Sequence, residues 1–87
     1  MTMDGLDGNA IAGQLFDVFG EEMTTAIGTC AGCKARGPVA EFAVYLRGPG
    51  TVARCPSCGD VVMVLVTIRE FTCVDLRGLA DLELTPN

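Results

Sequence analysis

The chain has 87 residues and a formal net charge of −5, with 49% hydrophobic and 20% charged residues. This apolar composition excludes a disordered chain, and the length predicts a single domain over residues 1–87. The acidic charge argues against nucleic acid and anionic membranes as partners, because both require a cationic surface. The longest unbroken apolar run, Val61 to Val66, is too short to cross a bilayer.

The chain contains five cysteines and no histidine. An odd number of cysteines fits poorly with a secreted disulfide framework. Met1 to Gly5 also lack the basic and then apolar arrangement of a signal peptide. We therefore expect a cytoplasmic protein, and at this length a metal would supplement its hydrophobic core.

Residues 7–20 predict an N-terminal helix. Asp7 suits the N-cap, and Gly20 is a good stop signal. Gly13 weakens the helix by roughly 1 kcal/mol relative to alanine, so packing must help to hold it. One face of the helix carries the apolar residues Ile11, Leu15, Val18 and Phe19.

Residues 23–76 predict an antiparallel sheet. Residues 39–47 alternate in the manner of a half-buried strand, with Ala40, Phe42, Val44 and Leu46 on one face. Gly48-Pro49-Gly50 is a turn signal, and residues 51–54 return as the antiparallel partner.

Val61 to Ile68 differs from the other predicted strands because both of its faces are apolar. We expect the small sheet to cover one face and the N-terminal helix to cover the other. Residues 71–76 predict a last strand. The tail, residues 77–87, carries leucines 79, 82 and 84 at roughly helical spacing.

Four cysteines form two Cys-x-x-Cys pairs, Cys30 with Cys33 and Cys55 with Cys58, separated by 21 residues. Two residues between cysteines allow a tight backbone turn, so that both sulfurs point at one ion. We predict that the four thiolates bind one structural Zn²⁺. No histidine is present, and four sulfurs leave no position open for a catalytic water, so we expect a non-enzymatic protein.

The residue after each pair closes the turn. Gly59 after Cys58 permits a left-handed conformation, whereas Lys34 occupies the same place after Cys33. Residues 25–68 resemble the zinc-ribbon class, which implies an α+β fold with a zinc ribbon-like antiparallel sheet, an N-terminal helix and the metal at one end.

Cys55-Pro56-Ser57-Cys58-Gly59 also resembles the second knuckle of rubredoxins, which implies Fe as the alternative metal. The aromatic core of that family is missing, since the chain has no tryptophan, one tyrosine and four phenylalanines. This difference favours zinc over iron.

The whole chain is similar to a family of small bacterial proteins defined as a domain of unknown function. The resemblance rests on Leu6-Asp7-Gly8-Asn9-Ala10 and Val74-Asp75-Leu76-Arg77-Gly78-Leu79. It implies neighbouring genes for a molybdopterin oxidoreductase similar to sulfite oxidase and for a flavoprotein similar to ferredoxin reductases. A redox enzyme is accordingly the partner that the resemblance implies.

Cys73, the fifth cysteine, is expected to be a small buried hydrophobe in the strand 71–76. Lys34, Arg36 and Arg54 lie close to the cysteine pairs in the sequence. They could mark a nucleic-acid patch, but the absence of neighbouring aromatic residues favours a role in offsetting the thiolate charge.

Three functions remain open from the sequence. The leading hypothesis is a non-enzymatic accessory subunit whose helix and hydrophobic strand dock a protein partner, with a redox enzyme as the candidate, or a second copy of the chain. The first alternative is a rubredoxin-like iron electron carrier. The second alternative is a zinc-ribbon regulator that binds nucleic acid.

Overall fold

The computed structural model describes residues 6–48 and 50–84, so the predicted features at Met1 to Gly5 and at Pro49 lie outside the described residues. The described elements are β1 (Leu6–Asp7), η1 (3-10 helix, Gly8–Ile11), α1 (Ala12–Phe19), β2 (Ile27–Cys30), β3 (Arg36–Pro38), η2 (3-10 helix, Val39–Glu41), β4 (Ala43–Arg47), β5 (Gly50–Arg54), β6 (Val61–Ile68), β7 (Phe71–Asp75) and β8 (Leu79–Glu83).

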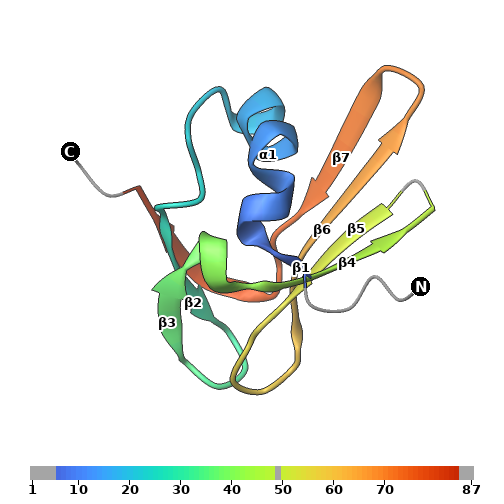
Figure 1. Ribbon diagram of the computed structural model, residues 1–87. Helices are drawn as coiled ribbons and strands as arrows, with labels where there is room; N and C mark the ends of the chain where they lie inside the picture. The colour runs from blue at the N-terminus through green and yellow to red at the C-terminus, as the bar shows by residue number, and fades with distance from the viewer. Residues whose placement is uncertain (1–5, 49, 85–87) are drawn as a thin grey trace.

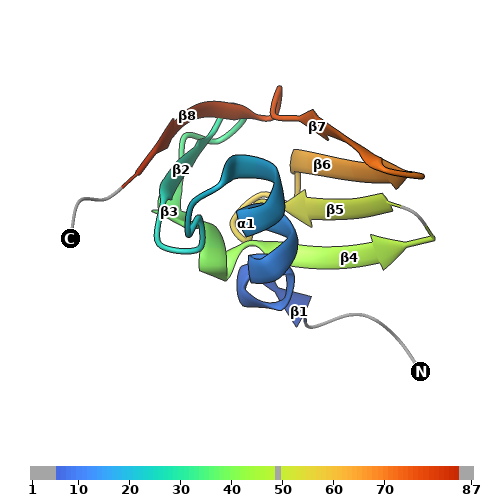
Figure 2. The same ribbon diagram turned by 90° about the horizontal axis from the view of Figure 1, so that it is seen from above.

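The strands form two antiparallel sheets, as Figures 1 and 2 show. One sheet has the order β1-β4-β5-β6-β7, and the other has the order β3-β2-β8. With α1 against the larger sheet, the architecture is α+β. Within the described part of the chain, no helix is long and apolar enough to span a membrane.

Asp7 and Gly20 cap the predicted helical segment, but the α-helix itself begins only at Ala12, after the 3-10 helix η1. The Asp7 carboxylate accepts a hydrogen bond from the backbone N–H of Asn9 at 3.0 Å. Gly20 adopts φ 75°, and its N–H donates to the Phe16 carbonyl at 2.7 Å. The first turn, however, is a 3-10 helix, and Gly8 within it lies so close to η2 that a Cβ would stand 1.9 Å from the Val39 carbonyl oxygen.

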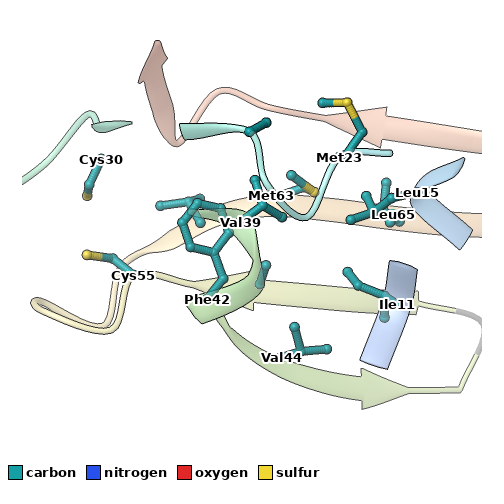
Figure 3. Packing of buried hydrophobic residues seen from close by; sticks show 13 residues of the cluster. Ile11, Leu15, Met23, Cys30, Val39, Phe42, Val44, Cys55, Met63 and Leu65 are labelled. Carbon is teal, nitrogen blue, oxygen red and sulfur yellow. The ribbon is translucent and has the colours of Figure 1, made fainter. Parts of the chain in front are cut away.

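The helix is held by packing against the larger sheet. Ile11 is 5% exposed and Leu15 is fully buried, and Figure 3 shows Leu15 directed towards Leu65 of β6. Met63, two residues earlier on β6, belongs to the same hydrophobic core. This face of the larger sheet, covered by α1, is called the inner face.

Residues 39–47 do not form one strand. Val39–Glu41 is a 3-10 helix because its backbone N–H groups find partners outside any sheet. The N–H of Val39 donates to the Ala26 carbonyl, and that of Ala40 to the Thr24 carbonyl, both at 2.9 Å. The strand begins at Ala43, and its predicted antiparallel pairing with residues 51–54 is confirmed.

β6 is covered on one face only, so the expected burial of both faces is wrong. Met63 and Leu65 on the inner face are 1% and 0% exposed, and Val62 joins them because the register with β5 shifts at Ala53 and Arg54. The opposite face, called the outer face, carries Tyr45, Val52, Val64, Val66, Ile68 and Phe71. Ile68 is 58% exposed and Phe71 is 73% exposed.

β7 forms at the predicted place, but Cys73 is exposed rather than buried. Cys73 lies opposite Val66, on the outer face. Because β7 is the last strand of its sheet and no described element covers the outer face, the side chain meets solvent.

The tail contains a strand instead of helical turns. β8 pairs with β2, and the register shifts so that Leu79 lies opposite Cys30 while Asp81 lies opposite Thr29. The extra residue, Ala80, resets the alternation, so Leu79 and Leu82 both pack on the core despite their helical spacing.

Alanine substitutions at two glycines should change the free energy of unfolding in opposite directions. Gly13→Ala should raise the free energy of unfolding by about 0.5–1 kcal/mol, because the Cβ meets nothing within 4 Å and alanine favours the helix. Gly8→Ala should lower it by about 2 kcal/mol or more, because the new Cβ overlaps the Val39 carbonyl. Urea unfolding of the metal-loaded proteins measures both, and equal effects of the two substitutions would contradict the packing of η1 on η2.

Candidate metal centre

The four paired cysteines meet at one end of the molecule. Cys30 is the last residue of β2 and Cys33 lies in the turn between β2 and β3 of the smaller sheet, whereas Cys55 and Cys58 lie between β5 and β6 of the larger sheet. All four sulfur atoms lie within 4.8 Å of one another. The residues predicted as ligands from their spacing are therefore brought together by two separate hairpins.

The distances between sulfurs fit a tetrahedral ion. Cys30 Sγ lies 3.7 Å from Cys58 Sγ, and Cys33 Sγ lies 3.6 Å from Cys55 Sγ. A tetrahedral ion with metal–sulfur bonds of about 2.3 Å spaces its ligands about 3.8 Å apart. The cluster can hold one metal ion, and its geometry suits zinc and iron alike.

Each cysteine pair and the turn that follows it form a knuckle, residues 30–35 in the first and 55–60 in the second. The two knuckles have the same backbone hydrogen bonds. In the first, the N–H of Lys34 donates to the Cys30 carbonyl at 2.9 Å, and in the second the N–H of Gly59 donates to the Cys55 carbonyl at 2.9 Å. The N–H of each leading cysteine donates to the carbonyl five residues later, at 2.9 Å for Cys30 and 2.8 Å for Cys55. Backbone hydrogen bonds thus hold each cysteine pair in its turn independently of a metal ion.

The closing residue of each knuckle is left-handed. Lys34 has φ 67° and Gly59 has φ 82°. For a residue with a Cβ this conformation costs about 1–2 kcal/mol, whereas glycine adopts it freely. The first knuckle therefore carries strain that the second does not.

Backbone N–H groups point at the sulfurs of the second knuckle. The N–H of Ser57 donates to Cys55 Sγ at 3.4 Å, and that of Asp60 donates to Cys58 Sγ at 3.5 Å. Such donors favour the thiolate, and the pKa of Cys55 falls to about 7, chiefly through the backbone N–H of Cys58.

The neighbouring thiols act in the opposite sense on Cys58. The N–H of Asp60 favours its thiolate, but burial and the three other cysteines outweigh that donor and raise the pKa of Cys58 to about 12. Four thiolates at this spacing repel one another, so they need a cation between them to ionise together. The donor set fits a divalent metal.

One side of the cluster belongs to the hydrophobic core. Cys30 and Cys55 are 3% and 4% exposed, and Figure 3 shows their sulfurs facing one another beyond Phe42. Cys33 and Cys58 are exposed. The ligands of a bound ion would thus come in equal number from the core and from the surface.

Two basic residues near the knuckles, which were expected to offset the thiolate charge, bind other groups of the chain. The Arg54 guanidinium donates to the Gly59 carbonyl at 2.9 Å and lies 5.9 Å from the centre of the Tyr45 ring. Arg36 pairs with Glu83 of β8 at 3.7 Å. Arg54 therefore positions the left-handed turn of the second knuckle, a role that sequence spacing did not indicate.

Asp60 is a further residue that the sequence did not single out for the site. Its carboxylate leans over the first knuckle, where a Cβ on Gly32 would lie 2.4 Å from the Asp60 Oδ2 atom. A side chain at position 32 would push this carboxylate aside. The small residue inside the first Cys-x-x-Cys pair was the available signal.

A family model described as a family of unknown function, DUF6510, matches residues 2–87. The chain belongs to this family. No curated protein and no solved structure matches the chain. Membership of DUF6510 assigns no activity.

The two closing residues make a matched pair of tests. Lys34→Gly should raise the free energy of unfolding of the metal-loaded protein by up to about 1 kcal/mol, because glycine adopts the left-handed conformation without strain. Part of that gain is offset because glycine also raises the conformational entropy of the unfolded chain. Gly59→Lys should lower stability by about 1–2 kcal/mol for the converse reason. Thermal unfolding of both proteins checks this, and a loss of stability in Lys34→Gly would contradict the strain.

Proposed function

We propose that the chain is a zinc ribbon-like, non-enzymatic interaction module. One structural Zn²⁺ on Cys30, Cys33, Cys55 and Cys58 joins its two sheets, and the outer face of the larger sheet docks a protein partner. The observation that carries the proposal is the uncovered apolar outer face, where Ile68 and Phe71 are 58% and 73% exposed.

The outer face is continuous across three central strands. Tyr45, Val52 and Val64 lie opposite one another on β4, β5 and β6. Ile68 lies opposite Phe71 at the far end of the β6–β7 hairpin. Contiguous apolar side chains of this kind on a small protein mark interaction sites, because burying them in a complex removes them from water.

The partner's chemistry follows from the charges around this face. On β7, the Asp75 carboxylate is neutralised by Arg77, because the Arg77 Nη2 atom lies 2.7 Å from the Asp75 Oδ2 atom. On the opposite side of the face, the Arg54 guanidinium lies over the Tyr45 ring. The chain as a whole carries a formal charge of −5. A partner with an apolar patch and an uncharged rim would pack on the face, and basic residues elsewhere on that partner would be attracted by the acidic charge of the rest of the chain.

Zinc is assigned a structural role because the ligand set is closed. Four sulfurs complete a tetrahedral shell, which leaves no position for a substrate or a catalytic water. The knuckles belong to different sheets, so the ion cross-links the molecule where both hairpins end. The sulfurs of Cys30 and Cys55 then become part of the core that positions β6.

Removing the metal should loosen the fold. Cys30→Ser or Cys55→Ser, or a strong chelator, should abolish cooperative unfolding, because the ligands repel one another and no longer hold the sheets together. Cys73→Ser, which lies outside the cluster, is the control and should leave metal content and unfolding unchanged. A metal-free protein that keeps its native circular-dichroism spectrum would overturn the structural role.

Iron is the second candidate because Cys33 and Cys58 are exposed. An exposed ligand gives an electron a short route to a redox partner at the surface. Elemental analysis and the visible spectrum of natively purified protein separate the candidates, since a ferric four-sulfur site is red and a zinc site is colourless. Stoichiometric zinc would dismiss the electron carrier.

Binding of nucleic acid receives no support from Arg36 and Arg54, two of the basic residues near the knuckles. Arg36 pairs with Glu83, and Arg54 is held by the Gly59 carbonyl. A phosphate would have to displace these internal partners and approach a chain of charge −5.

The outer face is tested by one charged substitution and a matched control. Ile68→Glu should abolish capture of the partner from the native cell extract, because it places a carboxylate beside Phe71 in the most exposed part of the apolar face. Phe16→Glu alters an equally accessible residue on α1, 52% exposed, and should leave capture intact. A partner retained equally by both variants would place the docking surface elsewhere.

A further inference from the structure

The β7 strand leaves an unprotected sheet edge. It is the last strand in the order β1-β4-β5-β6-β7, and Figure 2 shows no described element beyond it. Its pairing with β6 is regular from Phe71 to Asp75, without a bulge. The first four residues, Phe71 to Val74, carry neither charge nor proline, so this edge lacks the usual devices that prevent pairing with another strand.

The other free edges of the described sheets differ from β7. β1 has two residues and β3 has three, which is too short for a stable ladder. β8 is as long as β7 but carries Asp81 and Glu83, and these carboxylates repel a second copy of the same strand. β7 is thus the free edge that is both long enough and uncharged over most of its length.

The hairpin turn fixes which backbone groups of β7 are free. Arg69 and Glu70 form a two-residue turn, so Ile68 and Phe71 close it as a hydrogen-bonded pair. Hydrogen-bonded and non-hydrogen-bonded pairs alternate along an antiparallel ladder. The N–H and C=O groups of Thr72 and Val74 therefore point away from β6, towards solvent.

We propose that two copies of the chain pair through β7, antiparallel about a twofold axis at Cys73. In this register Thr72 of each copy pairs with Val74 of the other, so all four outward N–H and C=O groups of each strand find partners. Cys73 then faces Cys73 of the second copy across the axis. A strand is self-complementary in this way only when its free groups are placed symmetrically, as they are here.

The local charges allow like chains to approach. The segment 69–77 contains two arginines, Arg69 and Arg77, and two carboxylates, Glu70 and Asp75, so its net charge is zero. The rest of the chain carries the excess negative charge, which would repel a second copy at any acidic surface. A neutral edge therefore favours a second copy of this chain over a basic partner.

The dimer goes beyond the proposed docking function and rests on the proposed function only for the zinc ion that keeps the other four cysteines out of the tests. A twofold axis normal to the sheet keeps both outer faces on the same side, so the five-stranded sheets join into one continuous surface. A ladder this short buries less area than a standard protein interface, so we expect association at micromolar or higher concentration.

Cys73 is a built-in reporter of the register. Residues facing each other in a non-hydrogen-bonded antiparallel pair have Cα atoms about 4.5 Å apart, which is within the range of a disulfide. Mild oxidation of the zinc-loaded protein with diamide should yield a dimer linked through Cys73, mapped by mass spectrometry. Cys73→Ser should lose the covalent link and keep a reversible dimer in sedimentation equilibrium.

Opposite charges at position 73 test the symmetry directly. Cys73→Lys and Cys73→Glu should each be monomeric, because the substitution faces itself across the axis, and an equimolar mixture should restore the dimer. Phe16→Lys, which adds the same charge on α1, should dimerise like the wild type. Zinc content and circular dichroism confirm that each variant folds.

Two results would overturn the dimer. One is a zinc-loaded wild type that stays monomeric over the whole concentration series. The other is a dimer that survives in both Cys73→Lys and Cys73→Glu. Either result leaves the docking function standing, because that function is tested separately by Ile68→Glu.

Discussion

Four sulfur atoms from hairpins of two different sheets lie within 4.8 Å of one another, and this approach joins the two sheets at one end of the molecule. Thiolates at such distances repel, so all four cysteines can ionise together only with a cation among them. The backbone prepares for the ion in the same way on both sides, with the N–H of Lys34 and of Gly59 closing equivalent turns. A bound ion would thus join two preformed knuckles and would not have to build them.

Close backbone contacts bring the two hairpins to the same end of the molecule. Gly78 lies against β6 so closely that a Cβ would stand 2.0 Å from the Val61 carbonyl oxygen, and its own carbonyl accepts a hydrogen bond from Ala31 at 2.9 Å. Gly78 therefore contacts both the strand that follows the second knuckle and a residue within the first knuckle. Since Cys30 and Cys55 are buried in the same core as Leu15 and Met63, the metal site and the hydrophobic core form one packing unit.

The sequence predicted the features that depend on neighbouring residues. The Asp7 cap, the Gly20 stop, the β6 strand and the left-handed Gly59 after the second cysteine pair all follow from local chemistry. The misses depend on distant partners. Val39–Glu41 left the sheet because carbonyls before β2 took its N–H groups, and leucines 79 and 82 looked helical because a bulge lies between them. The exposure of Cys73 depended on which strand would end the sheet.

β6 shows how one strand can serve two purposes. Near the metal end Val62 and Met63 are each 1% exposed, whereas Ile68 at the other end is 58% exposed. A chain of 87 residues has one α-helix in its described part, and that helix covers the inner face. No further described element remains to cover the outer face, although β6 is apolar on both sides. The proposed ion fixes the buried end of β6, and the exposed end then presents apolar side chains from a sheet whose position is already set.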